Sequence, residues 1–385
     1  MKQELKILSL LHILNDGFRT TATTILPFVA KDLSLSLTQV GILGSSQTFI
    51  GTMFAIPSAY FAAKFGGFKL LFMSLILYSL GFLGIALSPH FFLLLIAFYA
   101  GAIGFAFFHP VSFALVTRIS EKGTKGKNMG NFLSLGDIGR MIVPTLALLF
   151  IPSFGWRIVM IVLSLVAFVI YLISQLGRSK EVYVNSRQVS DIELGKRAWL
   201  KSSLVLLKDG KFRKVLMSAM GDTLASSNIY LFLPFLLLLR GIAPAQLVIF
   251  TSTFFLGSLS GKFLLGRAVD IFGNRKVFIL SEFAMAAILL MLVASDSFVL
   301  LVFISLVLGV FTKGTSPVLQ TLISDVTHET HYEKAFGASE MFIQIAGAIT
   351  IFVSGILADH FGITVVFYMS AALAIFATFP VMRFK

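Results

Sequence analysis

The sequence predicts an all-α integral membrane protein in which twelve transmembrane helices form two six-helix bundles. Three observations predict this class. Of the 385 residues, 57% are hydrophobic and only 13% are charged, whereas an ordinary soluble domain is about 25% charged. Long apolar runs recur along the whole chain, and glycines and prolines recur at one constant separation between its halves. This composition excludes a soluble enzyme and a disordered chain and, because Cys is absent, a disulfide scaffold or a Cys-ligated zinc site.

The first half contains six predicted spans. A helix needs about 20 apolar residues to cross a bilayer, so the chain has room for about twelve crossings. Turn-forming or charged residues separate the apolar runs, as at Lys31 and Asp32 or at Ser88 and Pro89. Asp16 interrupts the first run and no cleavage site follows it, which predicts a retained span and not a signal peptide. The predicted spans are 7–30, 39–62, 69–88, 91–117, 128–151 and 156–176.

The second half contains six further spans of the same kind. Breaks fall at Arg240 and Gly241, at Gly273 and at Asp359. The predicted spans are 212–238, 245–265, 275–294, 298–323, 335–358 and 362–382.

The basic residues orient these spans. Lys and Arg crowd into the two termini and the even-numbered connections, whereas the opposite side carries only Lys31, Arg157 and Arg240. Because cytoplasmic loops carry the excess of Lys and Arg, both termini are predicted to be cytoplasmic. The net charge of +13 therefore indicates topology and contact with anionic lipid headgroups, and not nucleic-acid binding.

A repeat defines the domain organisation. Gly and Pro are the residues whose positions the backbone dictates most strongly, and several of them recur at one separation. The pairs are Pro27 and Pro234, Gly66 and Gly273, Pro110 and Pro317, Gly130 and Gly337, and Gly155 and Gly362, with Lys69 and Lys276 at the same separation. The sequence therefore predicts an N-terminal six-helix bundle at 1–178, a polar cytoplasmic linker at 179–207 and a C-terminal six-helix bundle at 208–385.

A motif follows the eighth span. Gly266, Asp270, Gly273, Arg275 and Lys276 fit the pattern G-x-x-x-D-x-x-G-x-R-K. Two parallel six-span halves and this motif together resemble the major facilitator superfamily of transporters. The resemblance implies a cytoplasmic gate in which Asp270 pairs with an Arg or caps a neighbouring helix in the inward-closed state.

Titratable groups inside the apolar spans are the main functional signal. An ionisable side chain at mid-membrane costs about 2.5–3.5 kcal/mol on insertion scales, so these residues are candidates for function. Their spacing places His12, Asp16 and Arg19 on one face of the first span. Asp137 and Arg140 likewise share a face of the fifth span.

The fourth span adds His109, directly before a proline. Counted from the cytoplasmic ends, Asp16, His109 and Asp137 lie at a similar depth, where a midplane site is expected. In one interpretation, Asp16 with Arg19 and Asp137 with Arg140 are self-neutralising pairs that hold the bundle together. In the other, these groups line a cavity, bind a polar substrate and exchange a proton, since histidine changes its charge near neutral pH.

The second half carries charges at different positions. Asp222, Lys313 and Glu340 lie in the seventh, tenth and eleventh spans. Lys313 is predicted to be near mid-span on a cavity-lining helix, either as a substrate residue or paired with Glu340 or Asp222. Glu282 lies in a span that is expected to face lipid, which predicts a snorkelling or packing residue.

Two short runs give a closer resemblance. His12–Asp16 reads H-I-L-N-D and Phe108–Ser112 reads F-H-P-V-S, and these are similar to the H-x-L-N-D and F-H-P-x-S runs of the fosmidomycin-resistance branch of the superfamily. The resemblance implies a proton-driven exporter of a small toxic compound in the bacterial inner membrane.

The fifth span partly matches an antiporter motif, G-x8-G-x3-G-P-x2-G-G. Gly130, Gly139 and Pro144 follow its spacing, whereas Val143 replaces the glycine before the proline. The acid and base in this span, Asp137 and Arg140, are additions to the branch pattern and suggest a polar, anionic or zwitterionic cargo.

Other site classes are not supported by the sequence. The run 257–263 is a near miss to a phosphate-binding loop, because it is one residue short and lies in a span. His328 and His331 fall in a connection and are expected to be solvated. We find no nucleophile–base set and no metal-ligand spacing, so no enzyme, cofactor or resident metal is predicted.

The sequence thus predicts a proton-coupled secondary exporter that works by alternating access as a monomer, with a small-molecule substrate, protons and membrane lipids as its partners. An importer or uniporter of a small organic anion or metal chelate is the alternative, favoured by Arg19, Arg140 and Lys313. A membrane receptor without transport is a third possibility.

Overall fold

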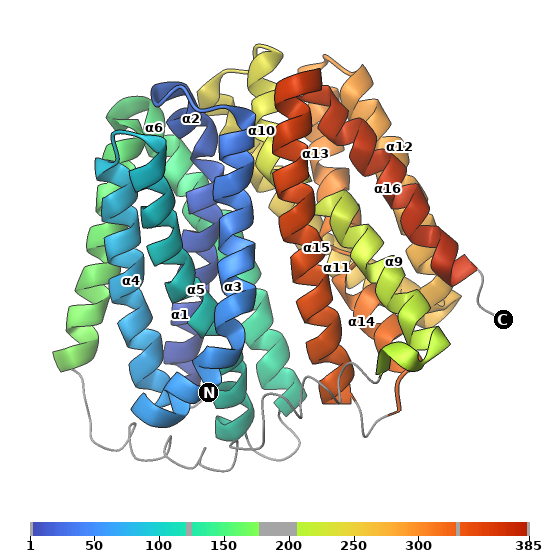
Figure 1. The fold of residues 1–385 in the computed structure, drawn as a ribbon, viewed down its shortest axis with the longest axis horizontal. Helices are drawn as coiled ribbons and strands as arrows, with labels where there is room; N and C mark the ends of the chain where they lie inside the picture. The colour runs from blue at the N-terminus through green and yellow to red at the C-terminus, as the bar shows by residue number, and fades with distance from the viewer. Residues whose placement is uncertain (1–2, 121–124, 177–205, 329–331, 383–385) are drawn as a thin grey trace. The chain divides into compact units, whose positions relative to one another are not determined.

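In the computed structural model, residues 3–120, 125–176, 206–328 and 332–382 are described. Among these residues the regular structure is entirely helical, which confirms the predicted all-α class. The chain divides into two compact units, Met1–Glu193 and Leu194–Lys385, coloured blue to green and yellow to red in Figure 1. The predicted linker, 179–207, lies outside the described residues except for its last two, so its boundaries stay predictions.

In the first unit, α1 packs against α6, α3 against α5, and α4 against both α5 and α6. Helix α6 contains two spans, because Gly155 has a positive φ of 76° that interrupts it. The helices are α1 (Gln3–Thr24), α2 (Leu26–Asp32), α3 (Leu37–Phe65), α4 (Gly67–Leu87), α5 (Phe91–Ile119) and α6 (Lys125–Leu176).

In the second unit, α16 packs against both α9 and α12, α11 packs against α13, and α15 against α9. The elements are η1 (Leu206–Lys208), α9 (Gly210–Ser226), α10 (Ile229–Leu239), η2 (Pro244–Gln246), α11 (Leu247–Phe272), α12 (Asn274–Ala294), α13 (Phe298–Thr312), α14 (Ser316–Asp325), α15 (Tyr332–Phe361) and α16 (Thr364–Met382).

The internal repeat is visible in the backbone. Gly66 and Gly273 have φ values of 90° and 82°, and Gly155 and Gly362 have φ values of 76° and 85°. Side chains with a Cβ rarely adopt this conformation, which explains why glycine stands at both members of each pair. Helices α4 and α12 begin directly after the first pair, so equivalent turns start equivalent helices in the two units.

Two arginines close the far ends of these equivalent helices. Arg157 donates to the carbonyl oxygens of Ala86 and Ser88, 2.7 and 3.0 Å away, at the end of α4. Arg240 donates to the carbonyl oxygens of Val293 and Ser295 at the end of α12. A helix end leaves carbonyl groups without intrahelical partners, and a cation there is favourable.

Three predicted spans are interrupted. The first is split between α1 and α2, the seventh between α9 and α10, and the tenth at 313–315 between α13 and α14. Proline stands in the first turn of α2 and of α14, as Pro27 and Pro317, where its missing N–H costs nothing. Each of these three spans therefore consists of two helical segments.

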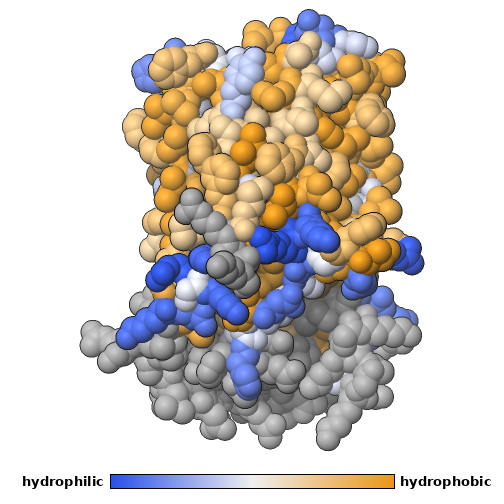
Figure 2. All heavy atoms as spheres, turned by 90° about the vertical axis from the view of Figure 1, so that its right-hand side faces the viewer, coloured by the Kyte–Doolittle hydropathy of each residue, from blue (hydrophilic) through white to orange (hydrophobic). Residues whose placement is uncertain are grey.

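Nine segments of the described residues are long and apolar enough to cross a membrane by length and composition. One of them, Asn131–Gln175, holds two spans that Gly155 separates. With α1–α2 and α3, these segments make up the predicted twelve spans. Figure 2 shows one face of the molecule, where hydrophobic side chains form a broad band bordered above and below by hydrophilic ones.

Candidate functional site

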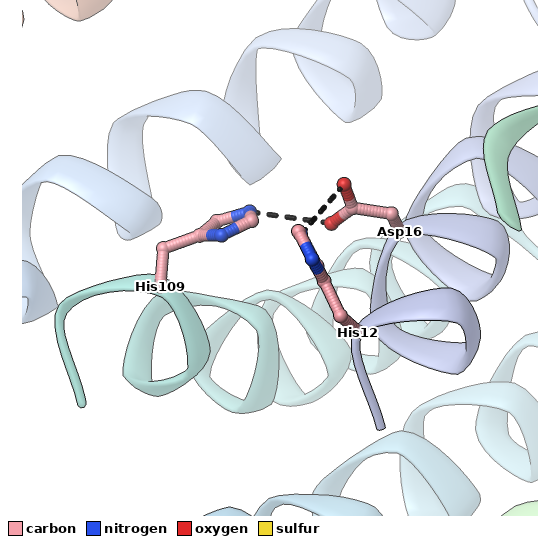
Figure 3. Close-up of side chains that lie close together, drawn as sticks. All are labelled: His12, Asp16 and His109. Atoms are coloured by element: carbon pink, nitrogen blue, oxygen red, sulfur yellow. Dashed lines mark ion pairs between the residues drawn. The ribbon is translucent and has the colours of Figure 1, made fainter. Parts of the chain in front are cut away.

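The first unit contains a buried cluster of charged side chains from three helices. Helix α1 carries His12 and Asp16 one turn apart, and each residue is 1% exposed. Helix α5 contributes His109, and Figure 3 shows this ring and that of His12 each joined by an ion pair to the Asp16 carboxylate. Helix α6 contributes Asp137 and Arg140. The structure therefore brings together five of the residues that the sequence singled out in this half.

Asp16 is the centre of the cluster. Its Oδ2 lies 2.7 Å from Nη2 of Arg140 and 3.3 Å from Nε2 of His12. Its Oδ1 lies 3.2 Å from Nε2 of His109 and accepts a hydrogen bond of 2.8 Å from Nδ2 of Asn15. A buried carboxylate is stable only when cations and donors surround it, and Asp16 has both.

The His12 ring has a defined orientation. Its Nδ1 lies 2.8 Å from the carbonyl oxygen of Phe132, which can only accept, so Nδ1 carries a hydrogen. In a neutral ring, Nε2 would then be a lone-pair acceptor that faces a second acceptor, Oδ2 of Asp16. A proton placed on Nε2 removes this conflict and lets His12 donate to Asp16.

Arg140 connects the two acids. Its Nη1 donates to Oδ1 of Asp137 at 3.0 Å while Nη2 contacts Asp16, so one guanidinium bridges α1 and α6. The predicted pair of Asp137 and Arg140 is therefore present, and the guanidinium on Asp16 comes from Arg140. Arg19 lies half-buried on α1, three residues beyond Asp16.

One side of the cluster is accessible. The side chains of His109 and Arg140 are 27% and 36% exposed, whereas those of His12 and Asp16 are almost completely buried. A polar ligand or a proton donor can therefore reach His109 and Arg140 first, and Asp16 only through them.

Two glycines allow α1 and α6 to approach this closely. A Cβ added at Gly139 would collide with the backbone carbonyl of Ile13, and one at Gly136 would collide with the ring of His12. Both glycines stand within one turn of Arg140 on α6, so the residues that admit α1 also direct Arg140 toward Asp16.

The same residues have the composition of a metal site. His12, Asp16 and His109 place one ligand atom each within 4.8 Å of one another. Two imidazoles and a carboxylate are ligands for zinc and similar ions, and a metal-binding histidine commonly donates its other ring N–H to a backbone carbonyl, as His12 does to Phe132. The Arg140 guanidinium on Asp16 opposes a dication, however. The sequence analysis named all three residues but did not predict a ligand set, because the third ligand comes from another helix.

Sequence reasoning missed three contributors. Tyr78 of α4 is buried, and its hydroxyl donates to Oδ1 of Asn15 and to the carbonyl oxygen of Gly104, the latter at 3.1 Å. Asn15 thereby links Tyr78 to Asp16. The carbonyl group of Phe132 orients His12. A tyrosine within an apolar span was the one available signal, whereas no side-chain pattern could indicate a backbone carbonyl.

The second unit has a smaller buried group. Asp222 of α9 is 4% exposed and accepts a hydrogen bond of 3.4 Å from Oγ1 of Thr315, at the break between α13 and α14. Lys313, at the same break, acts on Asp222 through its charge. Glu282 of α12 is completely buried, so the predicted snorkelling position is wrong. Glu340 is exposed on α15 and accepts a bond of 2.6 Å from Gln344 of its own helix.

The motif after the eighth span forms the turn between α11 and α12. Gly273 supplies its positive φ, and Arg275 donates to the carbonyl oxygen of Met382 at the end of α16. Asp270 is exposed, and within the described residues no ion pair or hydrogen bond involves it. Gly266 and Lys276 flank this turn on α11 and α12. The gating role of the motif stays a prediction.

Curated proteins with similar sequences are transporters of unknown substrate. The chain is 24% identical over 280 residues to the uncharacterized MFS-type transporter YfnC of Bacillus subtilis (strain 168), and the match covers 70% of this chain and 66% of YfnC, slightly less than two thirds of that protein. It is 28% identical over 120 residues to the uncharacterized MFS-type transporter YitZ of the same organism, covering 31% of this chain and 73% of YitZ.

Solved structures share the fold. A bacterial homologue of the human lysosomal transporter Spinster, in an inward-facing and occupied conformation, matches 98% of this chain and 95% of its own, with a TM-score of 0.79 and 15% identity. The nucleoside transporter NupG matches 99% and 100%, with a TM-score of 0.81 and 13% identity. A D-xylose–proton symporter matches 98% and 96%, with a TM-score of 0.78 and 15% identity. At these identities the likeness concerns the fold alone.

A family model covers nearly the whole chain. The model described as Major Facilitator Superfamily matches residues 8–220 and again residues 215–385, one match for each six-span half. This is a family of membrane transporters and not of enzymes. The chain belongs to the major facilitator superfamily.

Proposed function

We propose that this chain is a proton-coupled secondary transporter that exports a small polar compound, and that the cluster around Asp16 carries the coupled proton. One observation carries the proposal. The Nδ1 atom of His12 is engaged by the Phe132 carbonyl group, and its Nε2 faces Oδ2 of Asp16 at 3.3 Å in a buried position. Two acceptors in contact need a proton between them, and histidine is a side chain that can take up and release such a proton.

Arg140 makes the proton site responsive to cargo. Its guanidinium holds Asp16 and Asp137 together and is also partly exposed. An anionic group that binds Arg140 and His109 from the accessible side competes with Asp16 for the same cation. Because one guanidinium would contact both the cargo and Asp16, cargo binding and protonation of the His12–Asp16 pair influence each other.

The resemblance of His12–Asp16 and Phe108–Ser112 to the fosmidomycin-resistance branch supports export, and the charges on Arg140 and His109 support a polar, anionic or zwitterionic cargo. We further propose that the protein is a monomer in the bacterial inner membrane with both termini in the cytoplasm. The distribution of Lys and Arg supports this orientation.

The test is gradient-driven transport in vesicles that contain the purified full-length chain. A thermal-shift screen against fosmidomycin, organic acids and siderophores first identifies a ligand, and that ligand is then followed across a membrane with an imposed pH gradient. We expect accumulation by the wild type, and none by Asp16→Asn or His12→Gln. Asp296→Asn, which changes a highly exposed acid outside the cluster, is the matched control and should behave as the wild type.

Coupling at this cluster would be refuted if Asp16→Asn, Asp137→Asn and His109→Ala all retained gradient-driven accumulation. Accumulation that reverses its direction, so that cells take up the ligand and lose this uptake on Arg140→Ala, would favour the importer or uniporter of a small organic anion.

A second candidate is transport of a transition metal or its chelate, favoured by the ligand set of His12, Asp16 and His109. Equilibrium dialysis of the purified chain against zinc tests this candidate. Stoichiometric zinc binding that is lost on His109→Ala would support it, whereas zinc binding of equal strength in the wild type and in His109→Ala would exclude it.

A further inference from the structure

The second unit contains a buried acid that the proposed function does not use. Glu282 of α12 is completely buried, and neither of its carboxylate oxygens has a hydrogen-bond partner in the described part of the chain. A charged carboxylate in such a place is strongly unfavourable. Glu282 therefore needs either a proton or a partner.

The ionisable group that interacts with Glu282 is another acid. Asp222 of α9 is 4% exposed, and the carboxyl groups of Asp222 and Glu282 interact electrostatically. Helix α16 packs against both α9 and α12, which holds the two acids in the same part of the unit. Two ionised carboxylates in contact inside a low-dielectric region repel each other, so one of them is expected to stay protonated.

Few other charges face this pair. Lys313 acts on Asp222, and Thr315 donates to it, both from the break between α13 and α14. Helices α13 and α16 contribute no Asp, Glu, Lys, Arg or His within their spans. The remaining acids on the packed helices α11, α14 and α15 whose side chains the structure describes are Asp270, Asp325, Glu340 and Asp359, and all four are exposed.

We propose that Asp222 and Glu282 hold one proton between them and form a second protonation site, separate from the cluster around Asp16. A protonated Glu282 can donate to the Asp222 carboxylate, which gives the unpartnered oxygens of Glu282 a bond. One proton on the pair also leaves a single negative charge, which the positive charge of Lys313 balances. Removing the proton leaves an uncompensated negative charge in a buried position, next to the interrupted tenth span.

This inference does not depend on the proposed function, because it concerns different helices and has a readout without transport. The experiment is infrared spectroscopy of the full-length chain in lipid vesicles, in potassium buffer at neutral pH. The carbonyl stretch of a protonated carboxyl group lies apart from the bands of carboxylates and amides. We expect such a band in the wild type, and its loss in Glu282→Gln. Asp16→Asn and the exposed-acid control Asp296→Asn should keep the band.

A second measurement assigns the band without any substitution, so its result does not depend on whether a variant folds. Labelling the wild-type chain with ¹³C-glutamate or ¹³C-aspartate shifts the band of whichever residue type carries the proton, without any substitution. In addition, the thermal stability of the wild type should fall as the pH rises and the pair loses its proton, whereas Glu282→Gln, which stays neutral, should show a smaller dependence.

The proposal is overturned if the wild type shows no protonated carboxyl band, or if a band persists unchanged in both Glu282→Gln and Asp222→Asn. Loss of the wild-type band when sodium replaces potassium at constant pH would also overturn it, since the pair would then be a sodium site. Loss of transport in Asp16→Asn has no bearing on this outcome.

Discussion

At the scale of single residues, the cluster depends on the way in which each donor of Asp16 is held. Arg140 and His109 come from other helices, and Asn15 is held by Tyr78. The environment of Asp16 therefore depends on Asn15, Tyr78, His109 and Arg140 together. The removal of one partner leaves the remaining buried groups incompletely satisfied, which costs more than the lost bond itself.

We expect Tyr78→Phe to lower the free energy of unfolding by about 1–3 kcal/mol, because Asn15 and the carbonyl group of Gly104 both lose a buried donor. Thermal unfolding of the purified chain in detergent measures this change. Tyr368→Phe is the control, since Tyr368 is exposed on α16. Equal stability of the two variants would show that the hydroxyl of Tyr78 makes no net contribution.

The pH dependence of transport should follow His12. If the proton between His12 and Asp16 is the coupled one, the rate of gradient-driven transport depends on pH. In His12→Gln no gradient-driven transport is expected at any pH, because the amide cannot carry the coupled proton, while His328→Gln, in a connection far along the chain, should keep the wild-type profile. Identical pH profiles for the wild type and His12→Gln would exclude His12 as the titrating group.

At the scale of elements, close helix packing positions the site. Helix α1 approaches α6 closely where Gly136 and Gly139 of α6, and Gly17 of α1, have no Cβ. The sequence singled out Gly139 because its spacing fits an antiporter motif. In the structure this glycine allows close packing of α1 against α6, and this packing role does not depend on the direction of transport.

Gly139→Ala should separate α1 from α6 and weaken the contact between Arg140 and Asp16. We expect a destabilisation of about 1–3 kcal/mol, typical of overpacking, together with the loss of gradient-driven transport. Gly51→Ala is the matched control, because a Cβ at Gly51 meets no atom within 4 Å. Full transport activity in Gly139→Ala would contradict the proposed role of this close approach.

The arginines at the ends of α4 and α12 should contribute to stability. Arg240→Ala removes a cation that binds several carbonyl oxygens of α12, and we expect a loss of about 1–3 kcal/mol in thermal unfolding. Arg267→Ala should cost less, since Arg267 is exposed and only stacks on Phe263. The reverse order would mean that Arg240 does not close the helix end.

At the scale of the whole molecule, hydropathy and the internal repeat predicted the all-α class and the twelve spans correctly. Both signals are properties of long segments, which local packing does not alter. The charges in the first half also predicted much of the cluster. Titratable groups at a similar depth in membrane spans are unfavourable in contact with lipid, so they pair with one another.

The remaining details depend on packing that the sequence does not display. The burial of Glu282 depends on the rotation of α12, which places Phe278, Glu282, Met285 and Leu289 on one buried face. Since α12 is apolar all round, no periodicity revealed that face. The break at 313–315 was equally hidden, because the equivalent Pro110 lies within a continuous helix.

The proposed topology can be tested because the natural chain has no Cys. Single cysteines are introduced at Ser297, before α13, and at Arg267, near the end of α11. A membrane-impermeant maleimide should label Ser297→Cys in intact cells, and Arg267→Cys only after the cells are permeabilised. The opposite pattern would reverse the orientation derived from Lys and Arg.

The central claim is that a proton lies between His12 and Asp16, and nitrogen NMR of the ¹⁵N-histidine-labelled chain in lipid tests it most directly. The chain has six histidines, and the resonances missing from His12→Gln identify those of His12. We predict that Nδ1 stays protonated throughout, that Nε2 gains and loses its proton over the same pH range as transport, and that Asp16→Asn removes this change. An Nε2 atom that never carries a proton under conditions of active transport would contradict the account.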